Sequence, residues 1–314
     1  MKVSNMSYKT KSAGLLLGAL IAFTSCEGDL EVVQRIDEEF VGIERIEIES
    51  EFMEVNYQGI AGQSTVTLDG RLESSRPGNF RIEYEQEGNT LVIELDKNGL
   101  NVGNHRAVVN LVGPKELELN VESGSGRTVV SGIEYPHLHI SSGSGLIEVI
   151  QVIAPSIRLQ VGSGSIEGYG LVGNVDADAS SGKIEIGQME GDLAIKASSG
   201  HVSVKDLTGK LNVQMSSGNV EIANISEMES MKVSSGNVSG TDVGLTPKTR
   251  LTSSSGRISI KTFSDLNAFN YDFEAGSGRV TVGESSSSGS LKINNGAPST
   301  ISGSVSSGLI EIKN

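Results

Sequence analysis

The hydrophobic and polar positions of this chain repeat with a period of about 20 residues over most of its length. Between Ser180 and Ile222, three Ser-Ser-Gly motifs are each followed by an alternating strand, and their glycines lie 18 residues apart. The equivalent glycines of the whole series are at positions 126, 145, 164, 182, 200, 218, 236, 256, 278 and 308. A short fixed period built from strands is typical of a solenoid, in which each repeat forms one coil stacked on its neighbours.

Within one coil, the apolar residues occupy positions that share one face of a strand. Counted from the glycine, positions +2 and +4 are apolar, as in Val202 and Val204, and positions −7, −5 and −3 form a second apolar set. Alternation with β-branched residues predicts two strands whose apolar side chains point inward. A third inward corner is predicted at position +7, which holds Leu171, Met189, Leu207, Ile225, Val243 and Phe263.

The Ser-Ser-Gly motif itself favours a structural interpretation. It recurs in nearly every coil and has no helix after it, so it predicts neither a nucleophile nor a phosphate-binding loop. We expect the glycine to supply a positive φ at the corner between the strands, and the serines to bond local backbone groups there.

Residues 41–121 are also rich in predicted strands, but they lack the 18-residue period. Gly88 and Asn89 separate two alternating runs and predict a β-hairpin turn. The fold class is therefore all-β: an antiparallel β-rich N-terminal region over 41–121, followed over 122–314 by a single-stranded β-helix, or β-solenoid, of about 10 coils of 18–22 residues.

The repeats lengthen toward the C-terminus, where two insertions are expected over 262–273 and 285–300. The first contains four aromatic residues: Phe263, Phe269, Tyr271 and Phe273. Exposed aromatic side chains could bind a partner, whereas buried ones would pack over the end of the solenoid. An end coil leaves strand edges and an apolar cross-section open, so we expect the insertions to cover it and the protein to be a monomer.

Residues 1–25 have the pattern of a bacterial lipoprotein signal peptide. Lysines precede the apolar run Ala13–Phe23, which is too short to span a bilayer, and small residues precede Cys26, the single cysteine of the chain. We expect Cys26 to be lipidated; the alternative is an ordinary signal peptide with a chance cysteine. Residues 26–40 are expected to be an acidic tether, and the acidic residues after Cys26 also resemble the surface-export signal of lipoproteins from Bacteroidetes-type bacteria.

Charge is distributed unevenly. Residues 27–122 contain 21 acidic and 8 basic side chains, a net charge of −13, whereas residues 123–314 contain 18 and 14. An acidic chain without a basic stripe is a poor candidate for binding nucleic acid or an anionic membrane surface.

Two groups of polar residues could carry chemistry. Glu148, Glu167, Glu185 and Glu221 share outward position +3, which predicts either a solvated charge column or a calcium or sugar ladder. His137 and His139 share the outer face of one strand, but no third metal ligand is evident nearby. The loops around the glutamate column are short, which disfavours a glycosidase-type groove. We therefore expect no catalytic, metal or cofactor residues.

The repeated SSGxVxV coils, the hairpin that ends in YEQEGNTLVIEL, and GPKELELNVESGSG before the first coil resemble the toast-rack (DUF4097- and DUF2807-like) β-helix domains of bacteria, many of them named as adhesin-like. The resemblance covers roughly residues 40–314. It implies a β-solenoid without known catalytic residues, located in the cell envelope.

The function expected from sequence and resemblance together is a non-enzymatic envelope lipoprotein, an adhesin or binding module for a glycan or protein. We expect its lipid to anchor it to the outer membrane, on either the cell-surface or the periplasmic face. The alternatives are a glycan-active β-helix enzyme and a periplasmic envelope-stress or scaffold protein.

Overall fold

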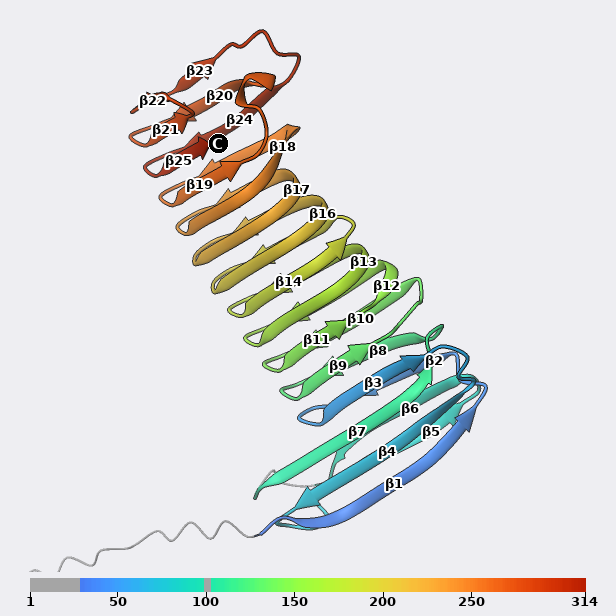
Figure 1. The fold of residues 1–314 in the computed structure, drawn as a ribbon. Helices are drawn as coiled ribbons and strands as arrows, with labels where there is room; N and C mark the ends of the chain where they lie inside the picture. Colours follow the sequence, from blue (N-terminus) through green and yellow to red (C-terminus); the bar gives the residue numbers. More distant parts are fainter. Residues whose placement is uncertain (1–28, 99–102) are drawn as a thin grey trace, which may run out of the picture.

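The chain folds into a β-solenoid, an elongated stack of coils (Figure 1). The computed structural model describes residues 29–98 and 103–314. This part of the chain contains no α-helix, only one 3-10 turn, η1 (Leu266–Ala268). Each coil contributes one strand to each of two faces: the first face contains β8 (Glu118–Ser123), and the second contains β9 (Arg127–Ser131).

In stacking order, the other short strands of the first face are β5 (Phe80–Glu87), β6 (Thr90–Lys97) and β2 (Arg45–Glu49) before β8, then β10 (His137–Ser142), β12 (Ile153–Val161), β15 (Leu193–Ala197), β24 (Thr300–Val305), β20 (Asn270–Ala275) and β23 (Leu291–Ile293). Those of the second face are β1 (Glu31–Val41), β4 (Thr65–Ser74), β7 (His105–Pro114) and β3 (Glu54–Ile60) before β9, then β11 (Leu146–Ile150), β14 (Lys183–Glu190), β19 (Arg257–Thr262), β25 (Leu309–Lys313), β21 (Arg279–Val282) and β22 (Ser285–Ser287). Four long strands belong to both faces: β13 (Ser165–Ala179), β16 (His201–Met215), β17 (Asn219–Val233) and β18 (Asn237–Ser253).

The predicted inward positions form the core. Val202 and Val204 of β16 are completely buried, and so are the residues in line with them on neighbouring coils. Stacked coils pair in parallel, so that equal positions of successive repeats lie side by side: Val202 pairs with Ile184 on one side and Val220 on the other. Period-2 patterning within a coil and the 18-residue period between coils therefore produce continuous apolar columns along the solenoid.

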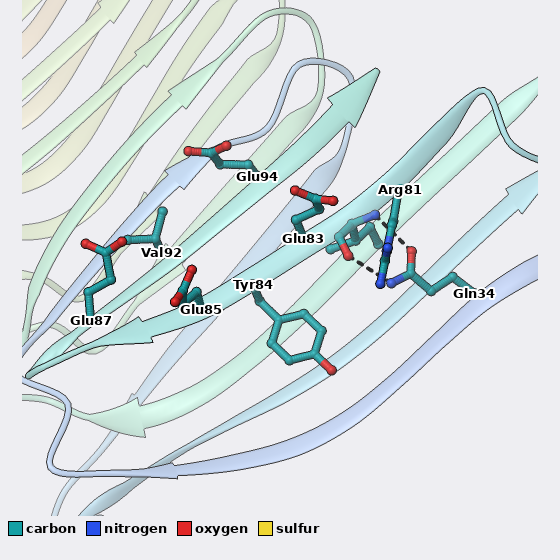
Figure 2. A pocket seen from close by; sticks show the side chains of 9 residues that line it. Gln34, Arg81, Glu83, Tyr84, Glu85, Glu87, Val92 and Glu94 are labelled. Carbon is teal, nitrogen blue, oxygen red and sulfur yellow. Dashed lines mark hydrogen bonds between the residues drawn. The ribbon is translucent and has the colours of Figure 1, made fainter. Parts of the chain in front are cut away.

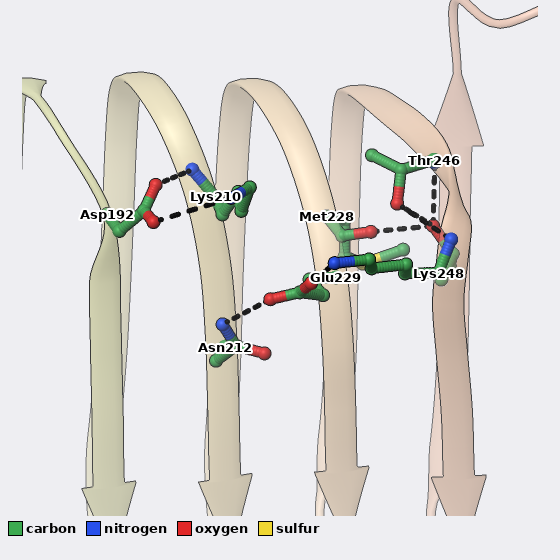
Figure 3. Close-up of polar contacts among 8 residues, drawn as sticks. Asp192, Lys210, Asn212, Met228, Glu229, Thr246 and Lys248 are labelled. Carbon is green, nitrogen blue, oxygen red and sulfur yellow. Dashed lines mark hydrogen bonds and ion pairs between the residues drawn. The ribbon is translucent and has the colours of Figure 1, made fainter.

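The third corner is also inward, as predicted except at Phe263, and most of the positive φ values of non-glycine residues occur beside it. Residues at position +6 have φ between 51° and 67° in six successive coils: Gln151, Gly170, Gln188, Asp206, Asn224 and Asp242. Asn, Asp and Gly tolerate this left-handed conformation best. Between this corner and the first face, polar bonds link neighbouring coils (Figure 3): Asp192 accepts from the backbone N–H of Lys210 at 3.1 Å, and Asn212 donates to Glu229 at 3.1 Å.

The ten equivalent glycines of the repeat series are required for a different reason from the one expected. Only Gly200 and Gly218 of the ten have positive φ, at 123° and 124°. At all ten positions, a Cβ atom would lie less than 3.0 Å from a carbonyl oxygen of the neighbouring coil. The conformational explanation is therefore wrong for most of the series: glycine is needed because the coils approach too closely here for any side chain.

The N-terminal region differs from the expectation in three ways. Residues 31–40 of the expected tether form most of β1, which pairs antiparallel with β4. The region is mixed rather than antiparallel, because β2 and β3 form a complete coil that pairs in parallel with β8 and β9. The solenoid thus begins well before residue 122. The strands β4 to β7 stack on the other side of the β2–β3 coil, and the hairpin at Gly88 and Asn89 is confirmed between β5 and β6.

At the C-terminal end, the coils are not stacked in chain order. The coil of β24 and β25, the last in the sequence, lies between β18–β19 and β20–β21 (Figure 1). Its inward residues Ile301, Val305, Ile310 and Ile312 are almost completely buried. The antiparallel strands β22 and β23 lie outside β21 and β20, so the expected cover of this end comes from residues 285–293.

Candidate functional site

A groove of about 460 Å³ lies on the second face, across β11, β13, β14 and β16. Its lining combines the outward residues at positions +3 and +5 of four successive coils, including Glu167, Tyr169, Gly187 and Lys205. We call it the Tyr169 groove. Because the backbone groups of these central strands are already paired with their neighbours, the groove offers side chains rather than a free strand edge.

The glutamate column predicted from the sequence forms one wall of this groove. Glu148, Glu167 and Glu185 are direct neighbours on adjacent strands, and Ser203 and Glu221 continue the column. These carboxylates stand in one row along the solenoid and do not face one another across a cleft. This row is not the arrangement in which a carboxylate pair performs acid–base hydrolysis.

Basic side chains balance the two outer glutamates of the row. Arg127 lies 2.5 Å from Glu148, and Lys183 lies 2.8 Å from Glu185. These hydrogen bonds raise the pKa of Arg127 and of Lys183, and the charge of Glu167 adds to both effects. Among the described residues, Glu167 itself has no ion pair. The middle carboxylate therefore keeps its acceptor oxygens free for a ligand.

Tyr169 is the aromatic residue of the groove, and its side chain is 50% exposed. Gly187 is its partner on the next strand, and a Cβ placed there would lie 3.6 Å from Cδ2 of the tyrosine. The ring therefore leans over a position without a side chain and lies along the sheet surface. Beyond the corner formed by Gly170, the paired residues Ile153 and Val172 are also exposed, at 49% and 38%. Exposed apolar surface thus gathers beside the groove.

A second groove, of about 490 Å³, lies over the edge strand β5 and its neighbour β6. Figure 2 shows the carboxylates of Glu83, Glu85, Glu87 and Glu94 around it. The side-chain amide of Gln34 bonds both the carbonyl (2.8 Å) and the N–H (2.9 Å) of Ile82. Gln34 thereby covers part of the strand edge, and like charges discourage another chain from pairing there, so the groove has a structural explanation.

A third, shallow groove of about 370 Å³ lies on the first face near the C-terminal end. Its floor is formed by the short side chains of β24, Ser302 and Ser304, with Arg250 on one side and Asp272 and Glu274 on the other. Lys292 pairs with Asp272 at 3.1 Å. The groove is polar throughout and lacks an aromatic surface.

The four aromatic residues proposed as a partner-binding cluster do not share one surface. Tyr271 and Phe273 point into the end coil and are 2% and 0% exposed, which excludes them as partner contacts and corrects the expectation. Phe269 packs partly buried against the core. The Tyr271 hydroxyl donates to the carbonyl of Leu266 at 3.0 Å, and burial raises the pKa of Tyr271 to about 12.

Phe263, in contrast, is 62% exposed and does not fill the third corner, although its position +7 predicted that it would. Thr262 takes its place: it pairs with Val243, is buried, and donates its hydroxyl to the Val243 carbonyl at 2.5 Å. A register shift between Gly240 and Val243 explains the change of one residue.

The remaining candidates are placed as follows. His137 and His139 lie on the outer side of β10, as alternation predicts. Across residues 29–98 and 103–314, no group of three His, Cys, Asp or Glu residues could hold a metal ion. Cys26 and the predicted signal segment 1–25 lie outside the described residues. In the part of the chain that is described, no helix is long and apolar enough to cross a membrane.

Sequence reasoning missed Tyr169, although the signal was present. Position +5 points outward by the same alternation as +3, and it holds Tyr169 in one coil and Gly187 in the next. Comparing the +5 residues between coils would have placed an aromatic ring over a glycine.

A model of the family described as Toastrack DUF4097 matches residues 43–313. No curated protein matches the chain. Solved structures that are similar include a "putative lipid binding protein" from Parabacteroides distasonis, with 16% identity, coverage of 90% of this chain and 97% of that one, and a TM-score of 0.41. A "putative adhesin" from the same organism has 13% identity, coverage of 91% and 98%, and a TM-score of 0.38. A "putative adhesin" from Bacteroides fragilis has 13% identity, coverage of 89% and 97%, and a TM-score of 0.31.

Proposed function

Because the chain belongs to the Toastrack DUF4097 family, we propose that it is a non-enzymatic binding module of the bacterial cell envelope, exported and anchored to the outer membrane by a lipid on Cys26. In this proposal the solenoid is a monomeric adhesin that displays a binding surface for a glycan or a protein at the cell surface.

The observation that carries the proposal is the register of the outward side chains. Equal positions of successive coils lie side by side, as Glu148, Glu167 and Glu185 do, so the faces present side chains at the strand spacing of about 4.8 Å. Because each interior coil is held on both sides by its neighbours, this surface is pre-organised, and binding an extended ligand would require little ordering.

The anchor is tested by the Cys26→Ala variant. The thiol of Cys26 would carry the lipid and lies before β1, so we expect the variant to leave the membrane fraction while its β-sheet circular dichroism stays unchanged. A variant that still partitions into the detergent phase would contradict lipid anchoring. Protease digestion of intact cells then separates the cell surface from the periplasm, where a scaffold protein would be protected.

The binding role is tested with beads that carry residues 27–314 and are passed over surfaces coated with glycans or with extracellular proteins. We expect retention on at least one class of surface, without chemical change of the coating. No retention on any surface would contradict the binding role. Release of shortened glycan fragments would instead favour the glycan-active enzyme.

A further inference from the structure

We propose that the Tyr169 groove is a saccharide-binding site for a neutral or amine-bearing oligosaccharide that lies along the solenoid axis. This inference rests on the proposed binding function and names the ligand class and the residues that take it.

The aromatic ring supplies the first element of such a site. Sugar rings have one face of C–H groups, which packs on the face of an aromatic ring. Tyr169 is half exposed, and its ring leans over the backbone of Gly187 with the nearest ring carbon 3.6 Å from where a Cβ would be. Because Gly187 adds no side chain beside the ring, the tyrosine and the glycine of the next coil together make an open apolar surface.

The polar residues around the ring supply the second element. Glu167 neighbours Tyr169 on the same strand, two residues away, and its carboxylate is free to accept hydroxyl hydrogen bonds. Lys205 lies one strand beyond Gly187, and its ammonium can donate to a ring or hydroxyl oxygen. An apolar surface with a small number of acceptors and donors at its margin is the usual composition of a small-ligand site.

The charge of the lining selects among saccharides. Glu148, Glu167, Glu185 and Asp206 line the groove, and Lys205 is the single cation among the lining residues. Arg127 and Lys183 beside the groove offset only Glu148 and Glu185, so Glu167 and Asp206 leave the charge around the groove negative. A uronic acid, sialic acid or phosphorylated sugar would therefore meet an unfavourable potential. Neutral sugars avoid this repulsion, and an amino group would be attracted by Glu167 and by the face of the Tyr169 ring.

The geometry of the groove selects the direction of the ligand. The lining crosses four coils, and successive strands are about 4.8 Å apart. This distance is close to the length of one hexose unit in an extended glycan, so consecutive sugar units meet consecutive coils. A peptide cannot bind here by adding a strand, because the groove lies on the face of fully paired strands rather than at an edge.

The experiment compares the unaltered protein, residues 27–314, with three variants on an array of neutral, amine-bearing and anionic glycans. We expect bound glycans to be neutral or amine-bearing, and Tyr169→Ala to weaken their binding about tenfold, measured by titration of the best glycan. Tyr169→Phe should bind as the unaltered protein does, because the ring and not the hydroxyl provides the stacking. Phe263→Ala is the matched control, because it removes another exposed aromatic residue on the same molecule and should change nothing.

Each result decides the question. Loss of binding in Tyr169→Ala, with the other variants unchanged and the thermal unfolding temperature preserved, supports the site. Binding only to anionic glycans, or binding that Tyr169→Ala leaves unchanged, overturns it while leaving the general binding role intact. The site is also overturned if the unaltered protein binds no glycan on the array but is retained on protein-coated surfaces.

Discussion

Replacing Gly164 by alanine tests why the coils require glycine at the ten repeated glycine positions. The backbone of Gly164 has no positive φ, so alanine is conformationally acceptable there. Its Cβ, however, would lie less than 3.0 Å from the carbonyl oxygen of Gly145 and 2.9 Å from the carbonyl carbon of Ser144. Both atoms belong to the backbone of the previous coil, so rotating a side chain cannot relieve the clash. The two coils must move apart instead.

The magnitude follows from what this movement disrupts. Overpacking of a well-packed site costs about 1–3 kcal/mol. Separation also weakens two hydrogen bonds that hold these two coils together, from the N–H of Ser165 to Gly145 (3.0 Å) and from the N–H of Ser163 to Gly143 (2.9 Å). Each contributes about 1 kcal/mol. We therefore expect Gly164→Ala to lower the free energy of unfolding by about 3–5 kcal/mol.

Gly62→Ala is the control with the opposite properties. Gly62 has a φ of 77°, and a Cβ there would have no atom within 4 Å. Alanine at this position suffers only the left-handed backbone penalty of about 1–2 kcal/mol. Urea unfolding of residues 27–314, followed by circular dichroism, compares the two variants with the unaltered protein. If Gly164→Ala loses no more stability than Gly62→Ala, close stacking is not the reason for these glycines.

Three further predictions concern the core, the end coil and its chemistry. Val202→Asp should lower the free energy of unfolding by several kcal/mol because it buries a charge, whereas His201→Asp on the outer face should change it by less than about 1 kcal/mol; equal losses in urea unfolding would refute the assigned register. Deleting residues 299–314 removes the coil between β18–β19 and β20–β21, so limited proteolysis should cut residues 263–298 first; unchanged protection would show that the end coil folds without it. Because the pKa of Tyr271 is raised to about 12, the stability that its neutral hydroxyl contributes is complete below about pH 10 and is lost as pH rises toward 12. Tyr271→Phe should therefore lose less free energy of unfolding than the unaltered protein between pH 9 and pH 11, as measured by urea unfolding.

The sequence predicted the interior of the solenoid well because local and repeated signals agree there. Alternation identifies Val202 and Val204 as inward, and the 18-residue period aligns them with the neighbouring coils. It failed for β1, in which Ile36 is the single buried residue, so no alternation exists to be recognised. That strand is held by its backbone pairing with β4 and by the side chain of Ile36, which packs over Gly70.

The order of the final coils could not be predicted for a related reason. Gly256, Gly278 and Gly308 each follow a serine and precede an alternating strand, and parallel pairing satisfies the backbone equally well in either order. Only the fit between whole coils decides that Gly308 lies against Gly256 and Gly278 against Gly308. The candidate site shows the same limit. Alternation shows that Tyr169 points outward, but the position of its ring beside Gly187 depends on how the two coils are stacked.

The displaced coil of β24 and β25 changes how this end of the molecule can be assembled. β24 and β25 follow β20 and β21 in the chain but lie inside them in the stack, so β20 and β21 can form their parallel pairings only once β24 and β25 are in place. Coils can therefore be added in chain order only as far as β19. The coil of β24 and β25 then completes the stack by pairing with β18 and β19 on one side and with β20 and β21 on the other. A chain that lacks β24 and β25 would therefore leave β20 and β21 without their parallel partners, instead of forming a solenoid that is one coil shorter.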